Sequence, residues 1–454
     1  MTTLARLLAG AGLDPALATQ ADLTGTDPTL PSSFRIGEAA QASIAALGLA
    51  AASLHAARGG PMQRVAVSMD DAAAEFHSER YMRIGDTPPR DPWDAIAGAY
   101  PTRDGVVRLH TNFPHHRDGI LALLGCANDR AAVAAALSQR EAVAFETEAT
   151  AAGLCVSAMR SFAEWDAHPQ AQHLATTPLL AIERIGDAPP RPLPALASRP
   201  LEGFRVLDLT RVIAGPVAAR GLAAHGAEVL HITSPHLPSI PTLVVDTGRG
   251  KSCAFLDLND AADAARLDAL AAGADAFVQS YRAGALAAKG FSAEALAARH
   301  PGIVVGELCA YGWGGPWANK RGFDSLVQTS TGFNVAEAEA AGAAPPKVLP
   351  CQPLDHASGY LLALGVVAAW QRRAAEGGSW RVRVTLARTG IWLRGLGRIA
   401  DGFAGVAPHT PSLVTEEGAF GMVRHVPHAA RMSVTPARWA RPAEPLGASP
   451  AAWM

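Results

Sequence analysis

Short apolar runs alternate with longer, helix-like segments between residues 200 and 310. The apolar runs predict strands at 204–209, 227–232, 254–258, 276–278 and 303–309. The segments between them predict helices at 216–225, 260–272 and 293–300, the first with a proline in its opening turn. Strands that alternate with helices are typical of a parallel sheet with helices on both faces, and ligands of such sheets bind beyond the carboxyl ends of the strands.

A further apolar run, Leu361 to Trp370, predicts a buried helix, and Asp355 stands directly before it. A carboxylate at a helix N-terminus meets unpaired N–H groups and the positive end of the helix dipole, which favour its ionised form. Such an aspartate is either a helix cap or a nucleophile directed at an acyl group. The pattern alone leaves both interpretations open.

Two proline-rich segments, 86–92 and 189–194, are typical of linkers. They divide the chain into an N-terminal helical module (1–90), a small α+β region (91–195), a large Rossmann-like domain (200–400) and a C-terminal segment (401–454). The expected fold class is therefore α/β, with a parallel sheet in the large domain. The turn after the first strand of that domain lacks the G-x-G-x-x-G pattern, which argues against a dinucleotide site.

An internal repeat relates residues 38–69 to residues 355–386 without a gap. Each copy predicts a helix, a glycine turn and a strand. Glu38 occupies the position of Asp355, but its copy lacks the equivalents of His356, Gly359 and Tyr360. We interpret the repeat as a duplicated packing module in which one copy is active.

Composition restricts the classes of function. The chain has 454 residues, of which 49% are hydrophobic and 18% charged, with a net charge of −2. This indicates a globular protein of two or three domains and argues against nucleic acid or an anionic membrane as the main partner. No apolar stretch reaches the length of a membrane span, and residues 41–57 come closest. Five dispersed cysteines without a CxxC pair predict a reduced, cytoplasmic protein, and no metal site is predicted.

Several motifs occur in a characteristic order along the second half of the chain. They are Arg205 to Arg211 with Ala214-Gly215-Pro216, then Gly250-Lys251-Ser252, Tyr281-Arg282-Ala283-Gly284, Tyr311-Gly312-Trp313-Gly314-Gly315-Pro316, Arg321-Gly322-Phe323-Asp324 and finally Asp355. In this order they resemble the family III CoA-transferases. Residues 93–185 resemble the small domain of that family and residues 413–453 its C-terminal return segment, so the segments follow a rearranged order.

The resemblance implies that coenzyme A or acyl-CoA is bound as a substrate, with a small carboxylic acid as the acceptor and no permanently bound cofactor. It also implies a homodimer and a reaction through a covalent intermediate on Asp355. Gly314 and Gly315 are the expected catalytic loop glycines, suited to stabilising an oxyanion and excluding water. The residues expected to bind coenzyme A are Arg211, Ala214, Gly215, Pro216, Lys251, Arg282, Tyr311 and Gly312. Lys251 and Arg282 are expected at strand-end turns, where they would supply positive charge.

Two other functions stay open. One is an acyl-CoA racemase or isomerase on the same fold, although the position where racemases of this fold carry a catalytic histidine holds Phe323, which cannot move a proton. The other is a non-catalytic CoA-binding subunit, because the usual charged residues after the second strand are missing. His356 has no ligand-spaced partner, so a structural or substrate-orienting role is favoured over metal binding. The cluster 112–117, which holds His115 and His116, could reach the substrate from the small domain, but adjacent histidines rarely bind one metal together, and a catalytic role is not favoured. The sequence does not identify the acyl group or the acceptor acid.

Overall fold

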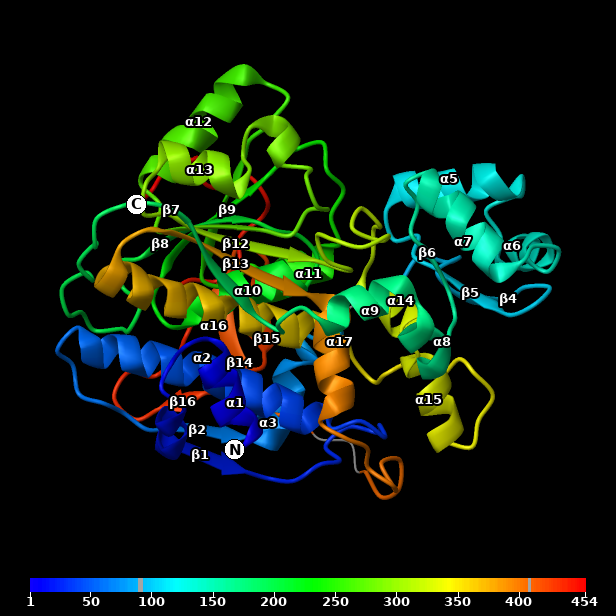
Figure 1. Cartoon of the computed structure of the whole chain (residues 1–454), viewed down its shortest axis with the longest axis horizontal. Coiled ribbons are helices and arrows are strands. Elements are labelled where there is room, and N and C mark those ends of the chain that lie inside the picture. The colour runs from blue at the N-terminus through cyan, green and yellow to red at the C-terminus, as the bar shows by residue number, and fades with distance from the viewer. Residues whose placement is uncertain (89–92, 407–409) are drawn as a thin grey trace.

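The computed structural model describes residues 1–88, 93–406 and 410–454 (Figure 1). Its centre is a seven-stranded sheet in the order β10-β9-β8-β11-β12-β13-β7. All neighbours in this sheet pair in parallel except β7, which is antiparallel to β13. The strands are β7 (Ala181–Gly186), β8 (Arg205–Leu209), β9 (Glu228–Thr233), β10 (Lys251–Phe255), β11 (Ala276–Gln279), β12 (Val304–Cys309) and β13 (Ser379–Thr385). The predicted α/β class is confirmed.

Helices cover both faces of the sheet (Figure 1). Successive side chains of a strand point to opposite faces, so Val206 joins the core beneath α10 and α16, whereas Leu207 joins the core beneath α12 and α13. Because both faces are buried, the strands are nearly continuous hydrophobic runs, as parallel strands usually are. The helices are α10 (Ala214–Ala224), α12 (Ala261–Ala272), α13 (Ala293–Arg299) and α16 (Pro353–Glu376).

The predicted elements of the large domain agree with the structure except at one strand. The strand expected at 254–258 is β10, which begins three residues earlier, at Lys251. Lys251 therefore lies at the start of a strand and not in a strand-end turn. The apolar run alone did not indicate this, because Lys251 and Ser252 are polar residues buried by contacts with distant parts of the chain.

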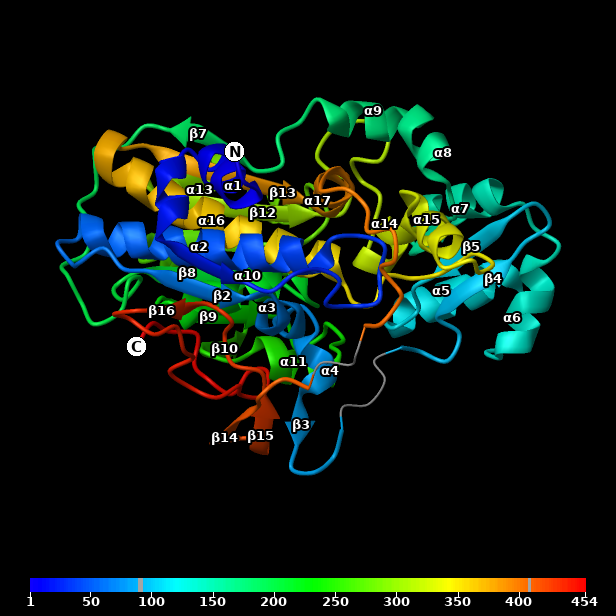
Figure 2. The same ribbon diagram turned by 90° about the horizontal axis from the view of Figure 1, so that it is seen from below.

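The internal repeat forms two similar units. In the first, α2 (Ile36–Ala57) leads through Gly59 and Gly60 to β2 (Val65–Ser68) and α3 (Met69–Glu75). In the second, α16 leads through Gly377 and Gly378 to β13 and α17 (Leu386–Gly395). The two long helices pack against each other in one hydrophobic core (Figure 2). The expectation that no apolar stretch reaches the length of a membrane span is wrong for α2, which by length and composition could cross a membrane. However, 89% of its most apolar 18-residue stretch is buried inside the protein, as in the core helix of a globular domain.

A smaller unit lies beside the large sheet (Figure 1). It has an antiparallel sheet of three strands with its own hydrophobic core. Its elements are β4 (Gly98–Pro101), β5 (Val106–Leu109), β6 (Val156–Ala158), α5 (Pro114–Leu124), α6 (Arg130–Leu137) and α7 (Ala142–Ala151). The structure differs from the expected range 91–195 at β7, which belongs to the large sheet. The expected boundary at 90/91, and most of the linker 86–92, lie outside the described residues.

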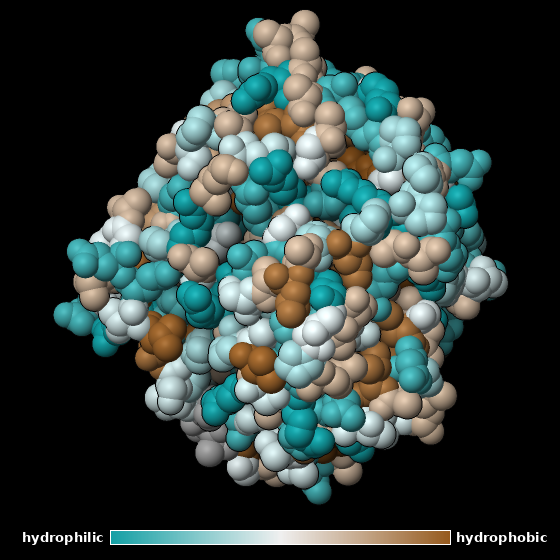
Figure 3. All heavy atoms as spheres, turned by 90° about the vertical axis from the view of Figure 1, so that its left-hand side faces the viewer, coloured by the Kyte–Doolittle hydropathy of each residue, from teal (hydrophilic) through white to brown (hydrophobic). Residues whose placement is uncertain are grey.

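Two further small sheets join the two ends of the chain (Figure 2). One contains β1 (Ala21–Thr24), β2 and β16 (Arg431–Met432), and the other contains β14 (Val414–Gly418), β15 (Gly421–His425) and β3 (Arg83–Ile84). The remaining elements are α1 (Thr3–Gly10), η1 (Pro15–Gln20), α4 (Ser78–Tyr81), α8 (Phe162–Ala167), α9 (Pro169–Ala175), α11 (Pro241–Thr247), η2 (Ala287–Lys289), α14 (Asp324–Ser330) and α15 (Phe333–Ala340). On the face shown in Figure 3, hydrophobic residues lie in small groups separated by polar ones.

Candidate active site

A cavity of about 500 Å³ lies where the carboxyl ends of β8, β11 and β12 face the small unit. Its walls come from the loops that follow these strands, from α5 of the small unit and from the first turn of α16. This is the place at which parallel α/β sheets usually bind ligands. Asp355 is the only carboxylate among the residues that line the described cavity.

Asp355 lies in the first turn of α16 and is 7% exposed. Its backbone N–H donates a hydrogen bond of 2.9 Å to Oδ2 of Asp324. Burial, followed by the nearby carboxylates of Asp324 and Glu79, raises the pKa of Asp355 well above its ordinary value. Desolvation and two like charges therefore oppose the effect of the helix N-terminus, which favours the ionised form of Asp355.

Asp324 supports this turn from α14. Its Oδ1 accepts a hydrogen bond of 2.5 Å from Nε2 of Gln328. Burial raises the pKa of Asp324 to about 6, although hydrogen bonds from the Asp355 N–H and the Gln328 side chain oppose the shift. Oε2 of Glu79 lies 3.4 Å from Nε2 of the buried His356, whose structural or substrate-orienting role stays a prediction. The sequence did not indicate that three carboxylates meet here, because they come from three separate segments.

The N-terminus of α10 forms another part of the wall, contributed by Ala214 and Gly215. Its N-cap, Ile213, makes no side-chain hydrogen bond to the first turn, so backbone N–H groups there can bind an anion. Gly359 allows this helix to approach α16, since a Cβ at Gly359 would lie 2.5 Å from the carbonyl oxygen of Ala214. Pro216 turns its carbonyl inward, where it accepts a 2.9 Å hydrogen bond from Lys251 Nζ.

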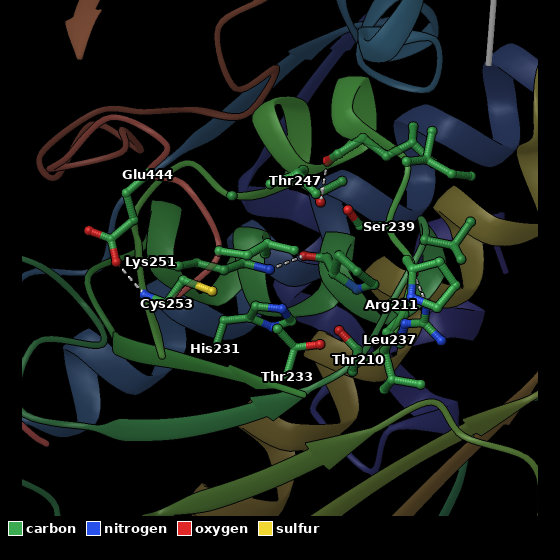
Figure 4. A pocket seen from close by; sticks show the side chains of 18 of the residues that line it. Thr210, Arg211, His231, Thr233, Leu237, Ser239, Thr247, Lys251, Cys253 and Glu444 are labelled. Atoms are coloured by element: carbon green, nitrogen blue, oxygen red, sulfur yellow. Dashed lines mark hydrogen bonds between the residues drawn. The ribbon is translucent and has the colours of Figure 1, made fainter. Parts of the chain in front are cut away.

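Lys251 is 3% exposed, and its ammonium group forms an ion pair of 2.8 Å with Oδ2 of Asp208. It lies on the wall of a narrower pocket of about 60 Å³ beside the main cavity (Figure 4). Phe113 and Arg211 line both spaces. Because Asp208 already neutralises Lys251, this lysine supplies less free charge than the sequence suggested.

Three guanidinium groups on the cavity wall form no ion pair with a carboxylate of the described residues. They belong to Arg211, Arg282 and Arg321. Arg211 donates a short hydrogen bond to the carbonyl of Pro238 and lies 5.0 Å from the ring centre of Phe113. Arg282 is exposed at the rim, in the loop after β11, as predicted from the sequence. The cavity therefore attracts anionic ligands.

The glycines of the loop after β12 lie outside the lining of the described cavity. Tyr311 lines the cavity, and its hydroxyl lies 3.0 Å from Oγ of Ser330. Gly312, Gly314 and Gly315 are absent from the described lining and pack near α9, where Gln170 donates a 2.9 Å hydrogen bond to the carbonyl of Gly314. Their expected catalytic and binding roles stay predictions, because this arrangement does not direct the loop at Asp355.

The small unit contributes residues that the sequence did not single out as catalytic. His115 and His116 line the cavity, and Nε2 of His116 lies 3.4 Å from Sγ of Cys155. Burial lowers the pKa of His116 to about 3 and raises that of Cys155 to about 12, so both are neutral. The cluster 112–117 was the signal in the sequence, but its position on the same cavity wall as Asp355 depends on how the two units pack.

The fold and this site define an α/β protein with a buried carboxylate in a cationic cavity. Residues 12–190 and 201–412 match the sequence model of CoA-transferase family III. The chain belongs to this family.

Two proteins similar to this chain are named as transferases of coenzyme A or acyl-CoA. An acetyl-coenzyme A transferase from Hypoxylon pulicicidum is 34% identical over 204 residues, which cover 44% of this chain and 34% of that protein. A probable fatty acyl-CoA transferase from Mycobacterium tuberculosis is 30% identical over 210 residues, covering 43% of this chain and 53% of that protein. A crystal structure of a hypothetical protein from the same organism is 31% identical, with a TM-score of 0.41, and covers 44% of this chain and 59% of that one. This chain thus spans about a third to a half of the curated relatives it matches.

Proposed function

We propose that this chain transfers coenzyme A from an acyl-CoA to a carboxylic acid, with Asp355 as the nucleophile. The observation that carries the proposal is the position of Asp355. It is the one carboxylate on the described wall of a cavity that otherwise presents guanidinium groups and a helix N-terminus. Those groups suit the phosphates of coenzyme A, and a carboxylate is the group that forms an anhydride with an acyl donor.

The reaction would proceed by four acyl exchanges. A carboxylate oxygen of Asp355 attacks the thioester carbonyl, the C–S bond breaks, and CoA thiolate leaves an aspartyl–acyl anhydride. The thiolate then attacks the aspartyl carbon, which releases the donor acid and leaves an aspartyl–CoA thioester. The acceptor carboxylate attacks this thioester and expels the thiolate again. Attack of the thiolate on the acceptor acyl carbon gives the new acyl-CoA and restores the Asp355 carboxylate.

The names of the relatives support this class of reaction. Besides the two transferases described above, a succinyl-CoA:glutarate CoA-transferase from Homo sapiens is 31% identical over 147 residues. A cinnamoyl-CoA:phenyllactate CoA-transferase from Clostridium sporogenes is 29% identical over 210 residues. Each of these two names joins an acyl-CoA to a carboxylic acid, which are the two substrates of the proposed reaction.

Trapping of the covalent intermediate tests the proposal. The protein is incubated with acyl-CoA and then with hydroxylamine, and peptide mass spectrometry looks for a hydroxamate on Asp355. The expected result is a hydroxamate in the wild type and none in Asp355→Asn. Exchange of the α-proton with deuterated water, without an adduct on Asp355, would instead indicate a racemase or isomerase and contradict the proposal.

A further inference from the structure

Asp355 also borders a second, smaller chamber of about 40 Å³. Phe323, Val212 and Ile213 separate this chamber from the main cavity, since they line both spaces together with Asp355. An acyl group carried by Asp355 can therefore extend into the chamber while coenzyme A occupies the larger cavity. The chamber is the part of the site that would distinguish one acyl group from another.

Three polar side chains on the chamber wall, those of His110, Ser325 and Glu79, have buried atoms without a hydrogen-bond partner among the described residues. Both ring nitrogens of His110 lack a partner, and so does Oγ of Ser325; each side chain belongs to a residue that is 3% exposed. A buried polar group without a partner costs about 1–3 kcal/mol, so such groups usually satisfy a ligand or another polar molecule. The unpaired atom of Glu79 is Oε2, which lies 3.4 Å from Nε2 of His356.

The imidazole of His110 is fixed in place by aromatic rings. It stacks on Phe323 with ring centres 3.7 Å apart and an angle of 10°, and it meets the edge of Trp93 at 5.6 Å. Burial, together with Arg108 and His116, lowers the pKa of His110 well below its usual range. A neutral imidazole presents one donor and one acceptor, and a hydroxyl can pair with either of them.

The size of the chamber limits the acyl group. One water needs about 10–15 Å³ of this kind of volume, so about 40 Å³ holds roughly three non-hydrogen atoms. The rest of the wall is mixed. Ile213, Ile240 and Leu243 are apolar, and the polar or charged residues are Glu79, Arg80, Asn112, Asp324 and Gln352. A short branched group with one oxygen fits these dimensions, whereas a long fatty chain does not.

We propose that the acyl group handled at Asp355 is short and carries a hydroxyl next to the carbonyl, which His110 and Ser325 bind by hydrogen bonds. This inference rests on the proposed transferase function and adds its substrate class, the small 2-hydroxyacyl groups. His110 and Ser325 would then be residues that determine specificity and touch the substrate. They would act beside Asp355 without replacing it as the nucleophile.

Two esters that differ by one hydroxyl test the chamber. The specificity constant kcat/KM is measured for lactoyl-CoA and for propionyl-CoA, with acetate as the common acceptor. The expected preference of the wild type for lactoyl-CoA is about 10- to 100-fold. His110→Phe keeps an aromatic ring over Phe323 but cannot bind the hydroxyl, so the preference should fall to about two-fold through loss of lactoyl-CoA turnover. Ser325→Ala should lower it in the same direction, and Ser138→Ala, on the exposed end of α6, should leave it unchanged.

The outcomes separate this inference from the function on which it rests. Equal rates for the two esters would contradict the proposal that the chamber selects 2-hydroxyacyl groups, and so would turnover of octanoyl-CoA as fast as that of lactoyl-CoA. A hydroxamate on Asp355 would still support the transferase function in either case. If no ester modifies Asp355, the transferase proposal fails. Calorimetric binding of the two esters to the wild type then tests the chamber directly, and equal affinities would reject it.

Discussion

At the scale of single residues, the site places three carboxylates close together in the interior. Asp355 and Asp324 are joined through the Asp355 N–H, and Glu79 lies near enough to raise the pKa of Asp355. Like charges in a buried place resist ionisation together. A desolvated carboxylate that does ionise is poorly stabilised and is correspondingly reactive towards a thioester. The arrangement therefore lowers the folding stability of the protein at Asp355, the residue proposed as the nucleophile.

The stability of Asp355→Asn should differ from that of the wild type in a pH-dependent way. The pKa of Asp355 is higher in the folded protein than in the unfolded chain, where it is near 4. The wild type therefore loses folding stability as the pH rises above about 4, until Asp355 also ionises in the folded state. Asparagine has no such titration. The variant should therefore gain about 1–2 kcal/mol at pH 7.5 and little at pH 3.5. Urea unfolding at both pH values measures this, and an equal difference at both would contradict it.

The rate of acyl transfer to Asp355 should rise with pH. Only the ionised carboxylate attacks, and burial with its two carboxylate neighbours raises the pKa at which it forms. Asp324→Asn removes one of those negative charges, so its pH–rate profile should move to lower pH. Single-turnover trapping between pH 5 and pH 9 provides the profile. A rate in the wild type that is constant over this range would show that Asp355 ionises at its ordinary pKa.

At the scale of elements, the site depends on two helices that meet at their N-termini. Gly359 on α16 permits this contact, because a Cβ there would lie 2.5 Å from the Ala214 carbonyl and 2.9 Å from Cβ of Val217. The contact brings the first turn of α10 beside Asp355. Backbone atoms cannot move aside as a flexible side chain can, so the spacing of the two helices is sensitive to this one residue.

Gly359→Val should separate α10 from α16. Overpacking of this kind costs about 1–3 kcal/mol of folding free energy and should also lower the affinity for coenzyme A. Gly395→Val in α17 is the matched control, since nothing lies within 4 Å of a Cβ at that position. Thermal unfolding and calorimetric titration with coenzyme A measure the two effects. Equal stability of the two variants would mean that the contact does not restrain the helices.

Local patterns in the sequence predicted most of the large sheet and the helix that carries Asp355, because apolar spacing follows from which face is buried. They did not predict that β10 starts at Lys251, which is paired with Asp208, or that β7 crosses into the large sheet to pair with β13, since neither partner is a sequence neighbour. The three-carboxylate cluster and the position of His110 over Phe323 were missed for the same reason. The charges at Arg211 and Arg282 were found through ordered motifs.

At the scale of the whole molecule, the N-terminal module and the C-terminal segment complete each other. β16 pairs with β2, and β3 pairs with β15, so residues more than 300 positions apart share small sheets. The same module supplies α2, which packs along α16 and buries the helix that carries Asp355. The rearranged order of segments that the sequence resemblance predicts is thus compatible with a core shared by the two ends of one chain.

The distribution of charge over the molecule leads to a prediction about ligand binding. The chain has a net charge of −2, yet Arg211, Arg282 and Arg321 face one cavity without a carboxylate partner among the described residues. Attraction between this cavity and the phosphates of coenzyme A should weaken as salt screens it, over a Debye length of about 10 Å at 0.1 M ionic strength. Raising NaCl from 0.05 M to 0.5 M should increase the Kd several-fold.

Arg282→Gln isolates the exposed member of this group. The substitution should weaken binding of coenzyme A by roughly three- to ten-fold at low salt, and the difference from the wild type should shrink at high salt because the lost interaction was already screened. Arg6→Gln in α1 removes the same charge from a residue that does not line the cavity. This control variant should leave the Kd unchanged. Calorimetric titration at two salt concentrations distinguishes the variants. Equal salt dependence in Arg282→Gln and Arg6→Gln would place the phosphates away from Arg282 and leave Arg211 and Arg321 as the groups that bind them.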